Sequence, residues 1–274
     1  EMEQKVAGNL VIIGGAEDKD GECKILKEVV RLAGGKKACL VIITAAATSP
    51  KKVGGEYKEI FSRLGVPEIK LLNIRDRGDA QDGDLISLLN DATCIFFTGG
   101  DQLRITSLIG GTRLNEELFR KYQKGVVLAG TSAGASAMSE TMIVEGENDD
   151  APRKCTLKMA PGLGMLEGVV IDQHFAQRGR IGRLLSAIAQ NPHILGIGID
   201  EDTAVHVTPD GVFKVLGSQA VTVLDGKDIS HTNVSELNPK EILSITDVRL
   251  HVLSPGYKFD LKTRRCIGHK EPKV

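Results

Sequence analysis

The sequence predicts an α/β fold, a three-layer sandwich in which helices cover both faces of a largely parallel sheet, with additional antiparallel strands in the C-terminal third. Two observations lead to this prediction. In the first half of the chain, short apolar runs alternate with amphipathic segments, which is typical of parallel strands joined by crossover helices. After about residue 200, short strand-like runs are separated by turn dipeptides, which is typical of antiparallel hairpins.

The elements of the first half follow from apolar runs and helical periodicity. Strands are expected at residues 10–13, 39–43, 69–72, 93–98 and 126–128. Helices are expected at residues 23–32, 55–64, 85–90, 102–108 and 113–124. In the first of these helices, Ile25, Val29 and Leu32 recur at helical spacing among charged residues, so that one face is apolar.

The second half mixes the two kinds of strand pairing. A strand, a helix and another strand are expected at residues 165–171, 182–190 and 194–199. Strands of antiparallel hairpins are expected at residues 204–207, 212–216 and 220–224. A last pair, at residues 248–253 and 257–261, is expected to complete a sheet edge, and the acidic segment 145–153 is expected to be a loop. Because no Pro- or Ser-rich linker separates the halves, we expect a single domain over residues 1–274.

Composition narrows the class of protein. With 41% hydrophobic residues, 26% charged residues and a formal net charge of −1, the chain resembles a globular enzyme and has no basic field for nucleic acid. The five cysteines are scattered without a Cys-x-x-Cys pair, which favours a reducing compartment and disfavours a zinc site. There is no signal-like start and no apolar run of membrane-spanning length, so we expect a cytoplasmic protein without a membrane or nucleic-acid partner.

The most informative motif is Gly-Thr-Ser-Ala-Gly at residues 130–134, between an apolar run and a helix-like run. This spacing is that of a nucleophile elbow, a strained turn from strand to helix that exposes the serine hydroxyl. Ser132 is then the candidate nucleophile, and the N–H of Ala133 is a candidate donor to an oxyanion. From this motif alone, a tight turn in which Ser132 only caps a helix fits equally well.

Two glycine pairs also follow predicted strands. Residues 14–19, Gly-Gly-Ala-Glu-Asp-Lys, match neither the dinucleotide-binding nor the phosphate-loop pattern, so no nucleotide cofactor is expected there. Residues 99–102, Gly-Gly-Asp-Gln, end a strand at the same sheet edge as Ser132. A glycine pair at that edge lets backbone N–H groups approach a substrate, although turn formation alone also favours glycine.

A serine nucleophile needs a base and an orienting acid. Of the six histidines, His174 directly follows an apolar strand, which places it at the sheet edge expected for Ser132. Three carboxylates, Asp200, Glu201 and Asp202, follow another apolar run, and the pattern does not choose among them. The order serine, histidine, acid differs from the serine, acid, histidine order of α/β-hydrolases, which argues against an ordinary esterase or lipase.

Taken together, these blocks resemble the cyanophycinase family. The resemblance lies in residues 14–19, 99–102, 130–135 and 172–175, and in three arginines that follow, Arg178, Arg180 and Arg183. It extends from the first strand to about Glu201. The family consists of serine peptidases related to aspartyl dipeptidase and distantly similar to class I glutamine amidotransferases.

The resemblance implies hydrolysis of cyanophycin, a poly-aspartate polymer with arginine on each β-carboxyl group, to β-Asp-Arg dipeptides. It implies Ser132 as nucleophile, His174 as base and Glu201 as acid. It implies substrate-binding residues at Gln102, Asp172, Gln173, Arg178, Arg180 and Arg183. It further implies a cytoplasmic homodimer that needs no metal ion and no organic cofactor.

The charges near the predicted base suit such a substrate. We expect the arginines to bind carboxylates and Asp172 to accept a substrate guanidinium. We expect the N–H of Ala133 and that of Gly100 or Asp101 to hold the oxyanion. The alternative interpretation is that the arginines only solvate the start of a helix. Other functions left open are an aspartyl dipeptidase or esterase with the same three residues, and a non-catalytic binding member of the fold. A glutaminase is disfavoured because serine stands where that relative has cysteine.

Overall fold

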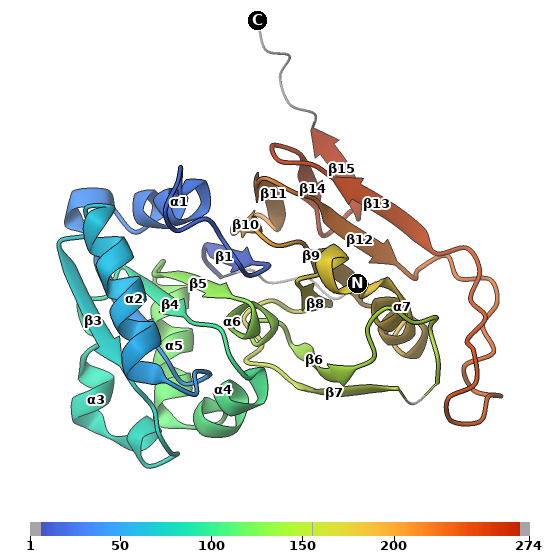
Figure 1. The fold of residues 1–274 in the computed structure, drawn as a ribbon, viewed down its shortest axis with the longest axis horizontal. Coiled ribbons are helices and arrows are strands. Elements are labelled where there is room, and N and C mark those ends of the chain that lie inside the picture. The colour runs from blue at the N-terminus through green and yellow to red at the C-terminus, as the bar shows by residue number, and fades with distance from the viewer. Residues whose placement is uncertain (1–6, 155, 269–274) are drawn as a thin grey trace, which may run out of the picture.

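The computed structural model describes residues 7–154 and 156–268, whose strands form two main sheets (Figure 1). The larger sheet has nine strands in the order β15-β14-β11-β10-β1-β5-β4-β2-β3. Its parallel part consists of β1 (Leu10–Ile13), β2 (Cys39–Ile43), β3 (Glu68–Leu72), β4 (Cys94–Phe97) and β5 (Val127–Thr131). The first two strands have the predicted bounds, whereas β5 continues beyond the predicted end to the residue before Ser132.

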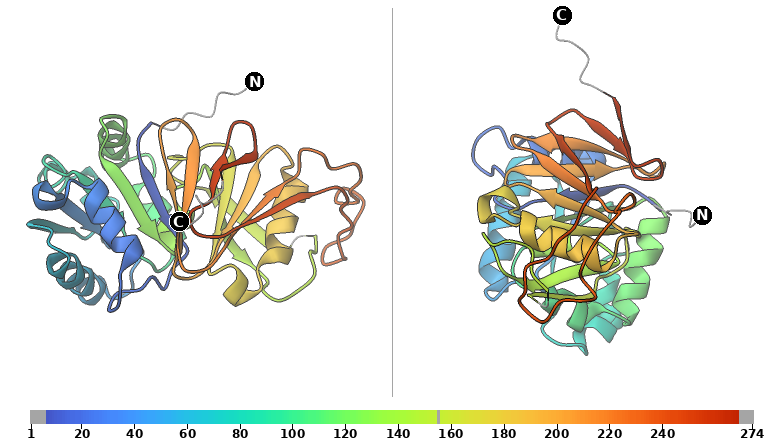
Figure 2. Two further views of the ribbon diagram at one scale, coloured as in Figure 1. Left: turned by 90° about the horizontal axis from the view of Figure 1, so that it is seen from above. Right: turned by 90° about the vertical axis from the view of Figure 1, so that its right-hand side faces the viewer.

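Helices cover both faces of the parallel part, so the predicted three layers are observed (Figure 2). The helices are α1 (Lys24–Leu32), α2 (Pro50–Arg63), α3 (Gly83–Ser87), α4 (Gln102–Ile109) and α5 (Arg113–Gln123). In β1, Val11 packs in one buried cluster with α1 and α2, whereas Ile12 packs in another with α4 and α5. This alternation is the two-residue period of a strand whose faces are both buried.

The second sheet has four strands in the order β13-β12-β9-β8. They are β8 (Val169–Gln173), β9 (Leu195–Ile199), β12 (Val221–Asp225) and β13 (Arg249–Leu253). The first two are parallel, and α7 (Ile181–Gln190) packs against this sheet through Leu184 and Ile188. A short helix after β5, α6 (Ala133–Ser136), contacts both β5 and β8, so strand ends from the two sheets meet there.

Antiparallel strands complete the large sheet, as predicted for the C-terminal third. They are β10 (Thr203–Val207), β11 (Val212–Gly217), β14 (Lys258–Asp260) and β15 (Arg265–Gly268). The expected hairpin between β10 and β11 is confirmed. None of the described helices combines the length and the apolar character needed to cross a bilayer.

The expected pairing of segments 248–253 and 257–261 is wrong. The first forms β13 and pairs with β12 in the small sheet, whereas the second contains β14, which pairs with β11 in the large sheet. Backbone hydrogen bonds explain why the chain passes from the small sheet to the large one after β13. The N–H of Gly256 donates to the carbonyl of Val215, and the N–H of Val215 donates to the carbonyl of Tyr257. The chain therefore joins β11 instead of folding back on itself.

A small antiparallel pair was not predicted. It consists of β6 (Thr141–Gly146) and β7 (Leu157–Pro161), so the expected loop at 145–153 begins inside a strand. Met142 and Ile143 of β6 are buried, and the apolar run to which they belong forms a strand that continues into the acidic segment as far as Gly146.

Candidate active site

The turn after β5 has the strained geometry that the glycine spacing predicts. Ser132 has φ 54° and ψ −112°, a conformation that side-chain-bearing residues rarely adopt. A Cβ at Gly130 would lie 2.5 Å from the carbonyl oxygen of Gly134, and one at Gly134 would lie 2.5 Å from that of Phe97. Both positions therefore require glycine, because backbone approaches them too closely for a side chain.

Ser132, His174 and Glu201 form a continuous chain of contacts. The Oγ of Ser132 lies 3.0 Å from Nε2 of His174, and Nδ1 of His174 lies 2.6 Å from Oε1 of Glu201. Ser132 follows β5 of the large sheet, whereas His174 and Glu201 follow β8 and β9 of the small one. The three residues thus lie where the carboxyl ends of strands from two sheets meet.

The glycine pair after β1 holds the imidazole in place. His174 has φ 45°, and its backbone N–H donates to the carbonyl of Gly14 at 2.8 Å. A Cβ at Gly15 would lie 2.4 Å from the imidazole ring, and one at Gly14 would lie 2.0 Å from the carbonyl oxygen of Asp200. The pair that matched no nucleotide motif therefore serves close packing around His174.

The surroundings of His174 favour a neutral imidazole. Burial lowers its pKa below the usual value, and the charges of Arg178 and Arg180 lower it further, whereas Glu201 raises it. With Nδ1–H donated to Glu201, Nε2 is left to accept a proton from the Ser132 hydroxyl. This is the protonation state that a general base needs at neutral pH.

The structure distinguishes the three carboxylates that the sequence left open. Asp200 accepts hydrogen bonds from the backbone N–H groups of Ala176 and Ala220, at 3.0 and 3.3 Å. Asp202 accepts from the N–H of Asp18 at 2.9 Å and from a serine hydroxyl. These two carboxylates stabilise turns, and Glu201 is the one that contacts the imidazole.

Comparison with known proteins shows the family of the chain. The model of peptidase family S51 matches residues 10–215. The chain belongs to this family. It is therefore a serine-type peptidase, as the sequence predicts. It is 41% identical over 264 residues to a cyanophycinase of Synechococcus elongatus, and this alignment covers 96% of this chain and 82% of the relative. It is 40% identical over 265 residues to a cyanophycinase of Geminocystis herdmanii, covering 96% of this chain and 97% of the relative.

A solved structure agrees as well. The crystal structure of a peptidase from an acI-B1 Actinobacterium superposes with a TM-score of 0.63 and 25% sequence identity, covering 90% of this chain and 98% of that one. The mixed α/β architecture of this S51 peptidase is thus shared with a known peptidase. The predicted fold class and the family resemblance are both confirmed.

One predicted oxyanion donor of this S51 peptidase has another partner. The N–H of Asp101 donates to the carbonyl of Ala46 at 3.0 Å, so it is not free to bind an oxyanion. The Asp101 side chain accepts from the N–H of Leu103 and caps α4. Within residues 7–154 and 156–268, the N–H groups of Gly100 and Ala133 have no hydrogen-bond acceptor, and they remain the candidate donors.

Asp172 does not have the role predicted for it. Its side chain is fully buried and accepts hydrogen bonds from the guanidinium of Arg183, including one of 2.7 Å from Nε, and from Arg180 at 3.4 Å. Its oxygens are thus occupied by arginines of the same chain, and a substrate guanidinium has no access to them. Arg183 is correspondingly committed to Asp172, so the expectation that it binds a substrate carboxylate is also not supported by the geometry.

The other predicted binding residues lie at different depths around Ser132. The side-chain oxygen of Gln173 lies 3.4 Å from Ser132 Oγ, and Arg178 is exposed in the short 3₁₀ turn η3 (Ala176–Arg178). Arg180 is 6% exposed and donates to the carbonyl of Gln173 at 2.7 Å. Gln102 uses its amide N–H to donate to Ile143 of β6 at 2.7 Å.

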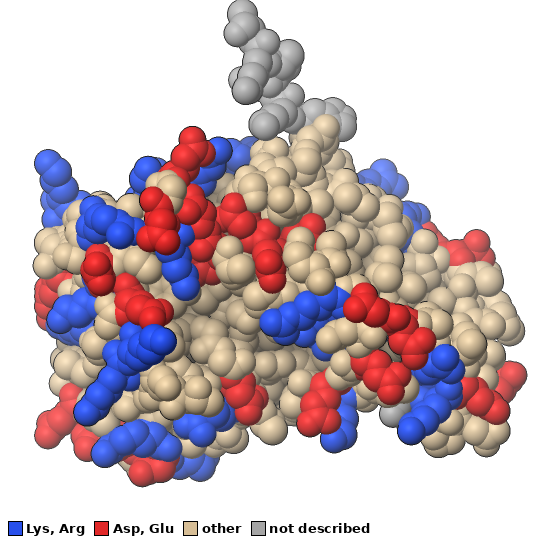
Figure 3. All heavy atoms as spheres, in the orientation of Figure 1, with Lys and Arg blue, Asp and Glu red and all other residues tan. Residues whose placement is uncertain are grey.

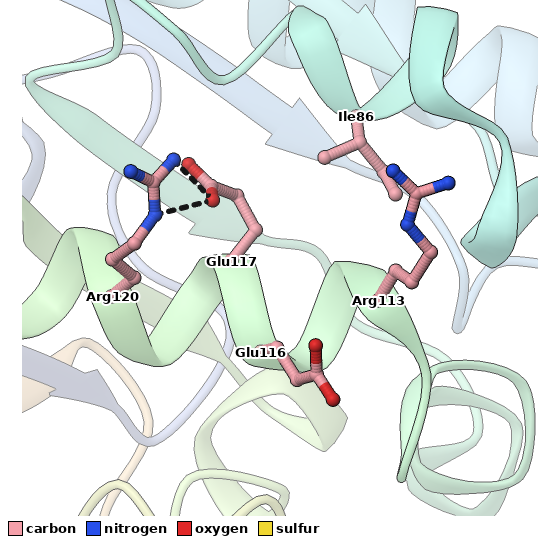
Figure 4. Close-up of a pocket in the computed structure, with 5 residues that line it drawn as sticks. All are labelled: Ile86, Arg113, Glu116, Glu117 and Arg120. Carbon is pink, nitrogen blue, oxygen red and sulfur yellow. Dashed lines mark hydrogen bonds and ion pairs between the residues drawn. The ribbon is translucent and has the colours of Figure 1, made fainter.

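A cavity of about 230 Å³ touches Ser132. It is lined by Ala16, Glu17, Lys19, Val53, Glu56, Tyr57, Gly99, Thr131 and Ser132. Sequence reasoning did not predict Glu17, Lys19 or Tyr57 as site residues, although the first two lie in the glycine block at 14–19. A second hollow of about 230 Å³, on α5, shares no residue with the first. There, Arg120 pairs with Glu117 at 2.6 Å (Figure 4).

Proposed function

We propose that this chain hydrolyses the poly-aspartate backbone of cyanophycin to β-Asp-Arg dipeptides, with Ser132 as nucleophile, His174 as base and Glu201 as orienting acid. The observation that carries the proposal is the contact chain of 3.0 and 2.6 Å through these three side chains. The substrate is supported by identities of 41% and 40% to relatives named cyanophycinase. The family resemblance supports the product.

Acylation begins when the Ser132 hydroxyl attacks a backbone carbonyl carbon of the polymer and gives its proton to Nε2 of His174. The N–H groups of Ala133 and Gly100 bind the oxyanion of the tetrahedral intermediate. The carbon–nitrogen bond then breaks, and His174 gives the proton to the departing amine. The strained turn at Ser132 acts as a nucleophile elbow, because it holds the hydroxyl away from the strand that precedes it.

Deacylation repeats these steps with water. His174 takes a proton from the water molecule as its oxygen attacks the acyl ester, and then returns a proton to Ser132 Oγ as the ester bond breaks. Throughout, Glu201 accepts the Nδ1–H of His174, fixes the tautomer and stabilises the imidazolium that forms transiently.

The proposal includes a cytoplasmic homodimer that works without a metal ion or organic cofactor, as the family resemblance implies. Light scattering on the purified protein tests the dimer. A mass of one chain at assay concentration contradicts it.

The substrate test compares cyanophycin, poly-aspartate and casein under one condition, with products identified by mass spectrometry. We expect cyanophycin alone to be degraded, with β-Asp-Arg as the product. Comparable cleavage of all three polymers contradicts the substrate and leaves a general serine hydrolase. Cleavage of none, together with no covalent labelling of Ser132 by a fluorophosphonate, indicates a non-catalytic member of the fold.

A further inference from the structure

The cavity beside Ser132 has an aromatic wall that already holds a cation. Tyr57 of α2 is 4% exposed and lines the cavity. The Nζ of Lys19 lies 4.7 Å from the centre of the Tyr57 ring. Cations bind to aromatic faces because the ring carries negative charge density on its faces. The ring is thus positioned to bind a positive group within the same cavity as the nucleophile.

A buried carboxylate stands behind this ring. Glu17 is 4% exposed, and its two oxygens accept hydrogen bonds from the hydroxyls of Tyr57 and Thr131, the latter at 2.7 Å. Burial and the Glu17 carboxylate raise the pKa of the Tyr57 hydroxyl well above its usual value, so this hydroxyl stays a neutral donor. Within residues 7–154 and 156–268, no ion pair involves Glu17.

A carboxylate buried without a cationic partner is unusual, because its desolvation is costly. Here a second carboxylate, Glu56 of α2, lines the same cavity from its exposed rim. The cavity therefore has two carboxylates and one ammonium group, that of Lys19. On the face drawn in Figure 3, acidic and basic side chains are interspersed over most of the surface.

We propose that this cavity binds the guanidinium group of a cyanophycin arginine side chain, stacked on Tyr57 where the Lys19 ammonium now lies, with Glu17 and Glu56 as its counter-charges. The inference rests on the proposed function, since it names the subsite for one part of that substrate. A planar guanidinium suits this place, because it can stack on an aromatic ring and pair with carboxylates at its edge. Asp172 cannot take this role, because Arg183 and Arg180 occupy it.

Lys19 has a defined part in this inference. Its ammonium group balances part of the negative charge of the cavity when no substrate is bound. Its flexible four-carbon stem lets the ammonium group leave the Tyr57 ring when a guanidinium binds. Removing the ammonium group should therefore favour binding of an arginine-containing substrate, whereas a lysine that only stabilises the fold has no such effect.

The test uses two short oligomers of β-linked Asp-Arg that differ in one group. One carries arginine, and the other carries citrulline, whose neutral urea has the same shape without the charge. Both are acetylated at the N-terminus, so that the terminal ammonium group is not a competing cation. We expect the wild-type kcat/KM to favour the arginine oligomer by on the order of 100-fold, because the cavity is built for a charged partner.

Glu17→Gln and Glu56→Gln should each lower this preference by about tenfold, since each removes one counter-charge. Lys19→Met should lower the KM for the arginine oligomer about threefold and leave that for the citrulline oligomer unchanged. Glu59→Gln is the matched control, because Glu59 is exposed on the same helix and does not line the cavity. It should leave the preference unchanged.

The outcomes separate the two proposals. Cleavage of neither oligomer by the wild-type enzyme overturns the proposed function, and the subsite with it. Cleavage with a preference that survives both Glu17→Gln and Glu56→Gln overturns the subsite alone. Glu17 is buried, so thermal unfolding of its variant is measured first; if that variant does not fold, the variants of the exposed Glu56 and of the half-buried Lys19 decide the result.

Discussion

The two sheets contribute different parts of the candidate active site. The large sheet provides Ser132 after β5 and Glu17 after β1, whereas the small sheet provides His174 after β8 and Glu201 after β9. Each side also buries a carboxylate. Asp172, on the small-sheet side, is 0% exposed, and Glu17, on the large-sheet side, is 4% exposed.

The partners of these two carboxylates differ. Asp172 accepts hydrogen bonds from Arg180 and Arg183, so its charge is balanced within the chain. Glu17 accepts from the hydroxyls of Tyr57 and Thr131, which are neutral. A buried charge that the chain itself neutralises has a structural role, and one held by neutral donors remains able to attract a cation. Burial alone therefore does not identify a binding residue; Glu17 differs from Asp172 both in its neutral partners and in lining the cavity beside Ser132.

Replacing the proposed nucleophile gives the largest expected effect, because the residues contributed by both sheets act on the Ser132 hydroxyl in the proposed mechanism. Ser132→Ala should lower kcat by on the order of a million-fold, with little change in thermal stability. Ser107→Ala, which removes an exposed hydroxyl from α4, should leave activity unchanged. Hydrolysis of cyanophycin is measured by product release. More than a few per cent residual activity in Ser132→Ala argues that another group is the nucleophile.

The second largest effect is expected on the small-sheet side. Glu201→Gln should lower kcat by about a thousandfold or more with little change in KM, because the imidazole loses its charged partner. Asp200→Asn and Asp202→Asn should have smaller effects on kcat, since these carboxylates accept from turn donors. Steady-state kinetics of the three variants gives the ranking. A larger loss in Asp200→Asn or Asp202→Asn moves the orienting role away from Glu201.

The two buried carboxylates should also differ in what they contribute to stability. Arg183→Met should lower the free energy of unfolding by about 3–5 kcal/mol, because it leaves Asp172 buried with an incomplete set of partners. Glu17→Gln should cost only about 1–2 kcal/mol, because the amide oxygen can accept from one hydroxyl and the amide NH2 can donate to the oxygen of the other. Denaturant unfolding measures both.

Arg31→Ala is the control for removing an arginine from a surface pair. Arg31 pairs with Glu28 at 2.7 Å and its side chain is 66% exposed, so the loss should be under about 1 kcal/mol. The double variant Asp172→Asn/Arg183→Met should recover only part of this loss, because it removes the buried carboxylate but leaves the buried Arg180 without its ion-pair partner. Equal stability of Arg183→Met and Arg31→Ala contradicts the structural role of the Asp172 cluster.

The sequence allowed the strand ends of the site to be predicted because they are local features. The fully buried runs of β1 and β2 have their predicted bounds, and the polar residues that follow β5, β8 and β9 include Ser132, His174 and Glu201. The rule that parallel strands end at one edge placed each of these residues at a strand end, but it did not predict that Ser132 follows a strand of one sheet and the other two follow strands of a second sheet. Their catalytic roles remain predictions.

Features that depend on contacts between distant segments were not predictable in this way. Asp172 contacts Arg183 only because α7 packs against the small sheet. The backbone N–H of Asp101 donates to the carbonyl of Ala46, which lies in the loop after β2. The need for glycine at position 15 comes from the imidazole of His174, far along the chain. In each case the residue type was visible in the sequence, but its partner was not.

The smallest expected effect is a shift in the pH dependence of kcat/KM. Two variants of Arg178, one without the charge and one that keeps it, show whether the charge causes the shift. His174 must be neutral to accept a proton, so kcat/KM should fall as the pH drops through the pKa of His174. The charge of Arg178 lowers this pKa. Arg178→Gln should therefore raise it and move the midpoint of the acid limb to higher pH, whereas Arg178→Lys keeps the charge and should leave the midpoint nearly in place. Because Arg178 is exposed, high salt should weaken the difference between wild type and Arg178→Gln. If the midpoint stays fixed in Arg178→Gln, or moves to lower pH, then the charge of Arg178 does not lower the pKa of His174.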